Sequence, residues 1–175
     1  DVVLAQIVII IQQEAKPILK NPLKFLQDTM LRAHAALGSY ANQFSMLETP
    51  RTTCVACIVQ GGQAYWAHVG DSRLCHYRQG TLVSQTRDHS KVQYLVDQGL
   101  LNAAEVGEHP DRNKVYSCLG GTVEPVIDLS TRALLRDGDI LLLCTDGLWG
   151  PLPSEEIATW LASKPILKAT PEMMR

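Results

Sequence analysis

The chain has 175 residues, a length that indicates one domain. Hydrophobic residues make up 46% and charged residues 19%, so the chain can bury a sizeable core and wholesale disorder is excluded. The net charge is −2 and there is no run of Lys or Arg, which gives no reason to expect a nucleic-acid partner. The chain has five cysteines, an odd number, and each lies in an apolar or strand-like run. This pattern favours free thiols in a reducing compartment over disulfides.

The N-terminal part of the sequence is expected to be helical over its first 47 residues, although a strand is the competing interpretation for residues 2–11. Asn21 suits a helix N-cap and Pro22 suits the first helical position. Apolar residues then recur at three- and four-residue steps, which predicts an amphipathic helix that ends near Gly38.

The longest apolar run, residues 7–11, is too short to cross a bilayer, for which about 20 residues are needed. The chain also begins without the basic lead-in of a secretory signal. These two observations predict a cytoplasmic protein with no membrane contact.

The middle of the chain changes to β-rich runs separated by turn signals. Gly61 and Gly62 form one such signal, and Asp71 lies in another. The pattern predicts an antiparallel meander in which consecutive strands pair and Asp71 occupies a connecting turn. The expected strands are residues 52–60, 63–69, 74–78 and 81–85.

The remaining residues mix both periodicities. Gly99 is a plausible stop for a helix that begins at Lys91, and Asn102 is a candidate N-cap for a short helix that the Pro110 region ends. Ser154 is a candidate cap for a last helix, with acidic residues in its first turn. Together with the meander, these elements predict an α+β layered fold. The expected elements are helices at residues 91–98, 102–108 and 154–162 and strands at residues 126–129 and 140–145.

Asp146 is the first candidate site residue, because it ends the strongly apolar run of residues 140–144. A rigid strand can aim a carboxylate at a ligand or metal ion, and Gly147 lets another group approach closely. Asp71 is the second candidate, in a Gly-Asp-Ser-Arg segment that offers oxygen ligands to a hard cation. Taken alone, each pattern is more typical of a simple turn, since Asp and Gly are common turn residues.

Other polar residues have plainer interpretations. Cys54 and Cys57 are three positions apart on a predicted strand, so they point to opposite faces and do not form a metal or redox pair. Three adjacent residues, Asp88, His89 and Ser90, cannot form a catalytic triad, and a polar loop that caps the next helix is the better interpretation. Arg112 is able to contact a substrate anion, but such an arginine is more often solvated or paired with an acid.

Taken together, several segments resemble the type 2C metal-dependent serine/threonine protein phosphatases (the PPM family), and in particular their bacterial branch. They come in the family's order from about Pro50 to about Ala162. The segments are residues 51–53 (Arg-Thr-Thr), 67–73 (Ala-His-Val-Gly-Asp-Ser-Arg), 86–90 (Thr-Arg-Asp-His-Ser), 109–113 (His-Pro-Asp-Arg-Asn, like the family's flap), 118–121 (Cys-Leu-Gly-Gly) and 143–148 (Leu-Cys-Thr-Asp-Gly-Leu).

The resemblance implies a β-sandwich of two central sheets flanked by helices in α-β-β-α layers, with two Mn²⁺ or Mg²⁺ ions that activate a water for phosphoester hydrolysis. It places Asp146 as a ligand to one of the two core ions and Asp71 as a ligand to a third. The third site is in doubt, because the family's second aspartate corresponds to Gly150 here. The family's N-terminal Asp-Gly-x-Gly-Gly segment, its phosphate-binding arginine and its final Asp-Asn pair have no counterpart in residues 1–175.

These observations predict one phosphatase-like domain, incomplete at both ends, from a protein that removes phosphate from phosphoserine and phosphothreonine in proteins. Its partners are then phosphorylated proteins, the products of a serine/threonine kinase. The alternative is a pseudophosphatase that binds phosphoproteins or regulates a partner without catalysis. A zinc- or thiol-based module is a third and weaker interpretation. The sequence names neither the substrate protein nor the kinase.

Overall fold

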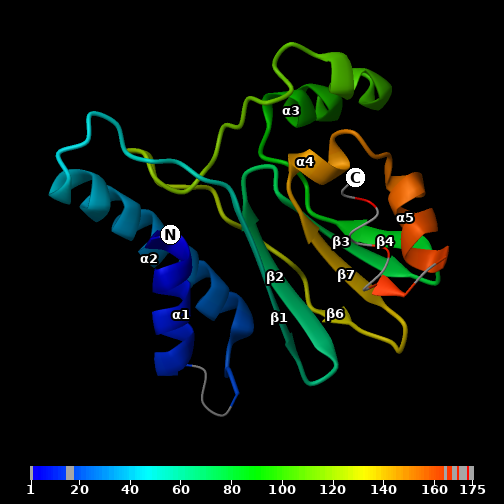
Figure 1. The fold of residues 1–175 in the computed structure, drawn as a ribbon, viewed down its shortest axis with the longest axis horizontal. Coiled ribbons are helices and arrows are strands. Elements are labelled where there is room, and N and C mark those ends of the chain that lie inside the picture. The colour runs from blue at the N-terminus through cyan, green and yellow to red at the C-terminus, as the bar shows by residue number, and fades with distance from the viewer. Residues whose placement is uncertain (1, 15–17, 164, 167–168, 170–172, 174–175) are drawn as a thin grey trace.

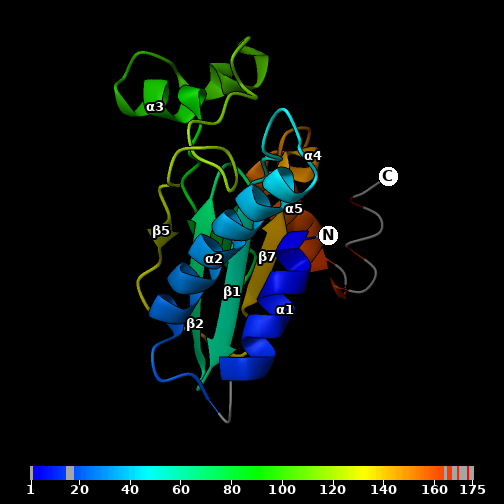
Figure 2. The same cartoon turned by 90° about the vertical axis from the view of Figure 1, so that its left-hand side faces the viewer.

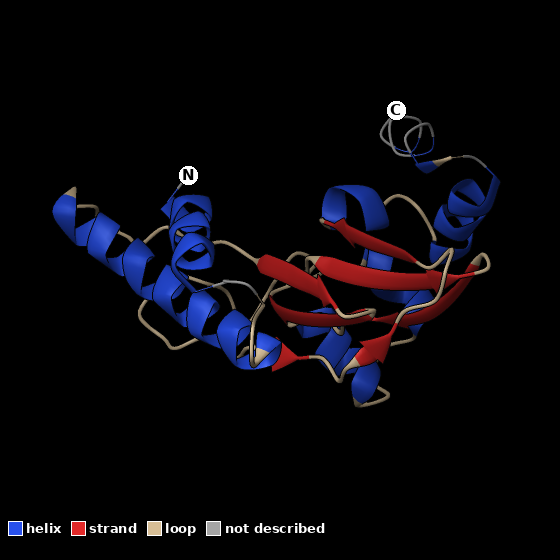
Figure 3. Ribbon diagram, turned by 90° about the horizontal axis from the view of Figure 1, so that it is seen from below, coloured by secondary structure: helices blue, strands red, loops and turns tan. Residues whose placement is uncertain are grey.

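The computed structural model describes residues 2–14, 18–163, 165–166, 169 and 173. In these residues two sheets lie between α1 and α2 on one side and α4 and α5 on the other (Figure 1, Figure 3). This arrangement confirms the expected α+β fold with α-β-β-α layers. The elements are α1 (Val2–Glu14), α2 (Pro22–Gln43), β1 (Cys54–Gln60), β2 (Gln63–Val69), β3 (Arg73–Arg78), β4 (Thr81–Gln85), α3 (Lys91–Asp97), the 3-10 helix η1 (Ala103–Glu108), β5 (Asp128–Leu129), β6 (Ala133–Leu134), β7 (Ile140–Cys144), α4 (Asp146–Trp149) and α5 (Ser154–Ser163).

Helices α1 and α2 cover the outer face of the sheet that contains β1 and β2 (Figure 2). The side chain of Asn21 accepts a hydrogen bond from the Lys24 backbone N–H at 3.1 Å, so the expected N-cap is present. The buried face of α2 follows the helical period and packs against β2. Its residues in this core are Leu26, Met30, Ala33 and Leu37.

Two N-terminal expectations are corrected or decided by the structure. Residues 2–14 are helical, so the competing strand interpretation is wrong. Helix α2 continues past Gly38 to Gln43, because buried Ala41 extends the apolar face by another turn. A glycine inside a helix costs only about 1 kcal/mol, which this packing offsets. Residues 18–21 and 44–47 were also expected to be helical and are not, while residues 15–17 lie outside the described residues.

The expected meander is wrong in its strand pairing. Strands β1 and β2 do form an antiparallel hairpin, and β2 also pairs with β5 and β6. Strand β3, however, pairs with β4 and β7 in the second sheet. The chain therefore crosses from one sheet to the other at residues 70–72. A turn signal in the sequence is the same for a hairpin and for a crossing, and the difference depends on which inner face each strand can bury.

Packing between the sheets explains why β3 takes this position. Ala64 and Trp66 of β2 share one buried cluster with Leu74 of β3. On the other side of β3, Cys75 and Tyr77 pack with residues of α5, including Ile157 and Leu161. Because β3 is buried on both faces, it occupies the centre of its sheet.

The C-terminal elements largely follow the sequence pattern. Strand β5 is only Asp128–Leu129, shorter than expected, and the short strand β6 and helix α4 were not expected from the pattern. Helix α5 begins at Ser154 as expected and reaches Ser163. None of the described helices combines the length and apolar character needed to span a bilayer.

Candidate metal-binding cleft

The candidate site is a cleft of about 640 Å³ beneath a projecting segment, residues 91–116, that we call the flap. The flap contains α3 and η1 and lies above α4 in Figure 1. Asp71 lies on the crossing between β2 and β3, and Asp146 begins α4 directly after β7. Both aspartates line the cleft, so the tertiary structure brings together two carboxylates from opposite halves of the chain.

The two carboxylates interact through their charges. The pKa of Asp71 is raised, first because the group is half buried and second because Asp146 is also negative. Neither carboxylate forms an ion pair in the part of the chain that the structure describes. The nearby Arg73 guanidinium is already bound to Asp88. Two carboxylates that repel each other and form no salt bridge among the described residues provide oxygen donors that suit a hard divalent cation.

Helix α4 determines where Asp146 sits. It is a single turn that starts at Asp146 and closes with a 2.8 Å hydrogen bond from the Gly150 N–H to the Asp146 carbonyl. Gly150 also lines the cleft, and a Cβ at this position would lie 2.5 Å from the Asp146 carbonyl oxygen. The glycine therefore permits a tight turn, and it also leaves the cleft without a carboxylate at position 150.

Arg73 and Trp149 connect the two aspartate-bearing segments. The Arg73 guanidinium donates two hydrogen bonds to Asp88, at 2.9 and 2.7 Å, and stacks 3.6 Å from the centroid of the Trp149 ring. The indole N–H of Trp149 donates to the backbone carbonyl of Asp71 at 3.0 Å. The Trp149 side chain of α4 thus contacts Asp71 on the β2–β3 crossing and Arg73 at the start of β3, which restrains Asp71 relative to Asp146.

A polar segment, residues 86–90, is hydrogen-bonded to the β2–β3 crossing, and we call it the polar support; all of its residues except Arg87 are buried. The Leu74 N–H donates to the Thr86 hydroxyl, and Ser90 caps α3 by accepting from the Gln93 N–H. The expected capping role of this segment is therefore confirmed for Ser90. Asp88 instead binds Arg73, as described above. Thr86, Asp88 and Ser90 are each at least 95% buried, so their hydrogen bonds form away from competing water.

His89 and Gly70 hold the crossing through two reciprocal hydrogen bonds. The Gly70 N–H donates to Nδ1 of His89 at 3.2 Å, and the His89 N–H donates to the Gly70 carbonyl at 2.9 Å. Gly70 has a φ of +98°, and a Cβ there would lie 2.3 Å from Cγ2 of Thr53. Only glycine fits this position, which directly precedes Asp71.

Three side chains that do not line the cleft, His68, His89 and Asp128, offer ligand atoms within 4.8 Å of one another. Because Nδ1 of His89 accepts from the Gly70 N–H, the ring proton lies on Nε2. That nitrogen is buried and lies 3.3 Å from the Asp128 carboxylate. A protonated nitrogen cannot ligate a metal ion, so the geometry favours a structural cluster over a second metal site.

The cysteines follow the sequence interpretation. All five are free. Cys54 packs toward α2 and Cys57 packs into the core between the sheets, so the two thiols lie on opposite faces of β1. The two thiols therefore do not share a zinc or redox site.

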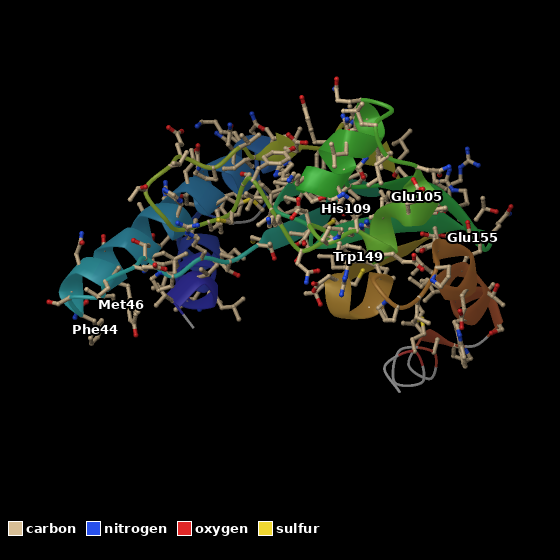
Figure 4. All side chains as sticks on the ribbon, turned by 90° about the horizontal axis from the view of Figure 1, so that it is seen from above. Phe44, Met46, Glu105, His109, Trp149 and Glu155 are labelled. Carbon is tan, nitrogen blue, oxygen red and sulfur yellow. The ribbon has the colours of Figure 1, made fainter. Side chains whose placement is uncertain are left out.

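Several functional neighbours of Asp71 are not evident from the sequence. No pattern in the sequence around Trp149 indicates a functional role for it. Arg73 and Asp88 are 15 positions apart, so the sequence does not indicate that they pair. The sequence does not show that Asp88 is buried, and this burial is what makes a charged partner necessary. Figure 4 shows Trp149 of α4 together with Glu105 and His109 of the flap, which projects over the cleft.

No family model matches the chain. In sequence, it is 36% identical over 132 residues to the serine/threonine protein phosphatase PstP of Mycobacterium tuberculosis, covering 74% of this chain and 25% of that protein. It is 33% identical over 141 residues to the serine/threonine phosphatase stp of Listeria innocua, covering 80% of this chain and 55% of that protein. The chain thus spans between a quarter and about half of these relatives' length.

The solved structures give the same result for the fold. The crystal structure of M. tuberculosis PstP superimposes with a TM-score of 0.82 at 28% identity, over 99% of this chain and 73% of that one. A second structure, the catalytic domain of PstP in complex with two manganese ions, gives a TM-score of 0.80 at 27% identity, over 99% and 72%. In sequence and in fold, the chain is therefore a homologue of the bacterial type 2C (PPM) serine/threonine phosphatases.

Proposed function

We propose that this protein hydrolyses phosphoserine and phosphothreonine esters on proteins, and that the reaction depends on Mn²⁺ or Mg²⁺. The observation that carries the proposal is the convergence of Asp71 and Asp146 on one cleft, within a fold shared with a manganese-containing phosphatase structure. Carboxylate oxygens are the donors that hard divalent cations prefer.

The residues present fit such an ion, with Asp146 and Asp71 as the proposed ligands. Both carboxylates face the cleft, repel each other and lack a cationic partner among the described residues. A hard cation takes about six oxygen ligands, some of them waters, so two carboxylates do not complete two ions. We infer that the remaining donors come from segments equivalent to the family's Asp-Gly-x-Gly-Gly and Asp-Asn motifs, and that residues 1–175 form part of a single phosphatase domain.

When bound, the ions supply an activated water and neutralise charge on the phosphoryl group. The residues of this chain contribute position. Asp146 is presented by a one-turn helix, and Asp71 is held by Gly70, His89 and the indole of Trp149. The flap lies over the same cleft, where it can limit the access of bulk water.

The proposed substrates are phosphorylated proteins, the products of a serine/threonine kinase, and the proposed compartment is the cytoplasm. Five free thiols support a reducing compartment. No nucleic-acid or membrane partner is part of the proposal.

A phosphatase assay tests the proposal. This chain and a form extended at both ends to the relatives' domain length are assayed on phosphopeptides, with and without Mn²⁺. We expect very poor turnover by the 175-residue chain and metal-dependent turnover by the extended form. Asp146→Ala in the extended form should lower kcat/KM by about 100-fold or more, because even residues that only orient metal ligands are worth 10–100-fold.

The contrary outcomes are distinct. Robust metal-dependent turnover by the 175-residue chain would refute the proposed need for further ligands. An extended form that binds Mn²⁺ but hydrolyses no phosphopeptide would favour the pseudophosphatase alternative. Metal analysis that finds zinc bound to the thiols would favour the third interpretation.

A further inference from the structure

Two of the five free cysteines meet where β3 and β7 pair. Cys75 on β3 lies opposite Leu142, and Cys144 on β7 lies opposite Arg73, so the two cysteines are diagonal neighbours on adjacent antiparallel strands. Residues two positions apart on a strand share a face, so both side chains point to the same side of the sheet. The packing agrees, because both belong to the apolar cluster that this sheet forms with α4 and α5.

The two thiols are in direct contact. A hydrogen bond from the Cys144 thiol lowers the pKa of the Cys75 thiol; burial opposes this effect, and the charge of Arg73 adds to it. A thiolate is the form of cysteine that reacts with oxidants and disulfides. Cys75 itself is 4% exposed, whereas Cys144 is only partly buried. A small oxidant therefore has access to the pair from the side of Cys144.

The cysteines of β1 lack this arrangement. Cys54 and Cys57 lie on opposite faces of their strand, and burial raises the pKa of both thiols. Each is therefore a thiol without the other in reach and without a lowered pKa. The two strands thus offer a matched comparison within one chain.

The thiol pair lies directly before Asp146. Cys144 ends β7, Thr145 is the N-cap of α4, and Asp146 is the first residue of that helix. Leu148 of α4 packs in the same cluster as both cysteines. A disulfide needs Cα atoms about 4.4–6.8 Å apart, whereas diagonal neighbours on paired strands are about 7–8 Å apart. A bond between these sulfurs must therefore draw β7 toward β3 and displace the start of α4.

We propose that Cys75 and Cys144 are an oxidative modification site, at which a reversible disulfide forms and weakens metal binding in the cleft. The effect on metal rests on the proposed function, whereas the disulfide itself does not. The oxidant is a peroxide. One thiol attacks a peroxide oxygen, the O–O bond breaks, and a sulfenic acid and water result. The second thiol attacks that sulfur, the S–S bond forms, and a second water leaves. The two thiols lose two electrons in total, and a small dithiol reverses the reaction by exchange.

Thiol mapping and metal titration test the two parts separately. The 175-residue chain is treated with hydrogen peroxide, its free thiols are alkylated, and its disulfides are mapped by peptide mass spectrometry without reduction. Mn²⁺ affinity is measured by isothermal titration on the form extended at both ends, before oxidation, after oxidation and after dithiothreitol. The variants are Cys75→Ala and Cys144→Ala, and the matched control is Cys54→Ala. Thermal unfolding of each reduced variant identifies any that fails to fold.

We expect peroxide to join Cys75 to Cys144 and to leave the other thiols free. Oxidation should weaken Mn²⁺ binding by wild type and Cys54→Ala about tenfold or more, as for other changes that disturb the support of a metal ligand. Dithiothreitol should restore the affinity. Cys75→Ala and Cys144→Ala should each keep their reduced-state Mn²⁺ affinity after peroxide, so either variant suffices if the other does not fold.

The contrary outcomes separate the claims. Thiols that all stay free, a disulfide between other cysteines, or oxidation that dithiothreitol does not reverse would overturn the modification site. A Cys75–Cys144 disulfide with unchanged Mn²⁺ affinity would overturn its effect on the cleft. A reduced extended form that binds no Mn²⁺ would count against the proposed function, while the mapped disulfide would still stand.

Discussion

The polar support and the flap turn (residues 109–114) use charge in opposite ways, and of the two only the flap turn supplies residues that line the cleft. In the support, Asp88 is 5% exposed and binds Arg73, whose side chain is 16% exposed, through two hydrogen bonds. In the flap turn, Asp111 pairs with two lysines that are 52% and 67% exposed, and the neighbouring Arg112 stays free. The comparison indicates that buried ion pairs near this cleft position the site, whereas an exposed cation remains available to a ligand.

The physical basis is desolvation. A buried charge has already lost its water, so removal of its partner leaves an uncompensated group and a large loss of stability. An exposed charge keeps its water until a substrate displaces it, so its removal costs little stability and mainly affects binding. The same type of substitution should therefore have different effects in the two regions.

The largest effect is expected from Gly70→Ala. The new Cβ would meet Thr53 at 2.3 Å with φ at +98°, so strain and overpacking should together lower the free energy of unfolding by about 4 kcal/mol. In the flap, Gly99→Ala also faces a positive φ, of +68°, but has no atom within 4 Å, and should cost about 1 kcal/mol. Chemical denaturation of both variants checks the difference, and equal losses would refute the comparison.

The next largest effect on stability is expected from Asp88→Asn. Arg73 would then lack its carboxylate, and the free energy of unfolding should fall by about 3 kcal/mol. The matched variant in the flap is Asp111→Asn, whose partners are solvated lysines, and it should lower the melting temperature by clearly less. If the two variants melt at the same temperature, burial is not what distinguishes the two pairs.

The pH dependence of metal binding should reveal the pKa of Asp71. Burial and the charge of Asp146 raise this pKa, so the folded protein keeps the proton at pH values where an exposed aspartate has lost it. Metal binding needs the carboxylate, so Mn²⁺ affinity should begin to fall at a higher pH than it would with an exposed aspartate at this position. Isothermal titration at a series of decreasing pH values measures the effect. Asp71→Asn should flatten the profile, and an unchanged profile would remove Asp71 from the ligand set.

Trp149→Phe is expected to have the smallest effect, a loss of about 1 kcal/mol in unfolding free energy, because one hydrogen bond to the Asp71 carbonyl disappears while an aromatic ring still stacks on Arg73. Mn²⁺ affinity should weaken slightly as Asp71 loses a restraint. Thermal denaturation and metal titration together test this role. A variant with unchanged Mn²⁺ affinity would show that the indole stabilises the fold without positioning the aspartate.

Local signals in the sequence determined much of this protein. Asn21 caps α2, Ser90 caps α3, and Asn102 caps η1 through a capping box with Glu105, all within three residues of their partners. The hairpin of β1 and β2 follows from its paired glycines. The order of the motifs was also enough to indicate the family and to single out Asp71 and Asp146. These features depend on neighbours along the chain, so the sequence carries them directly.

Only the tertiary structure decided which strands pair and which distant side chains contact each other. It assigned β3 to a second sheet, joined Arg73 to Asp88 and Trp149, and brought Arg112 to the same cleft as the two aspartates. Each of these depends on which surfaces two distant segments can bury against each other, and many pairings share the same local pattern. The sequence therefore determined which residues are able to act on a phosphate, and only the packing of the sheets decided which of them meet.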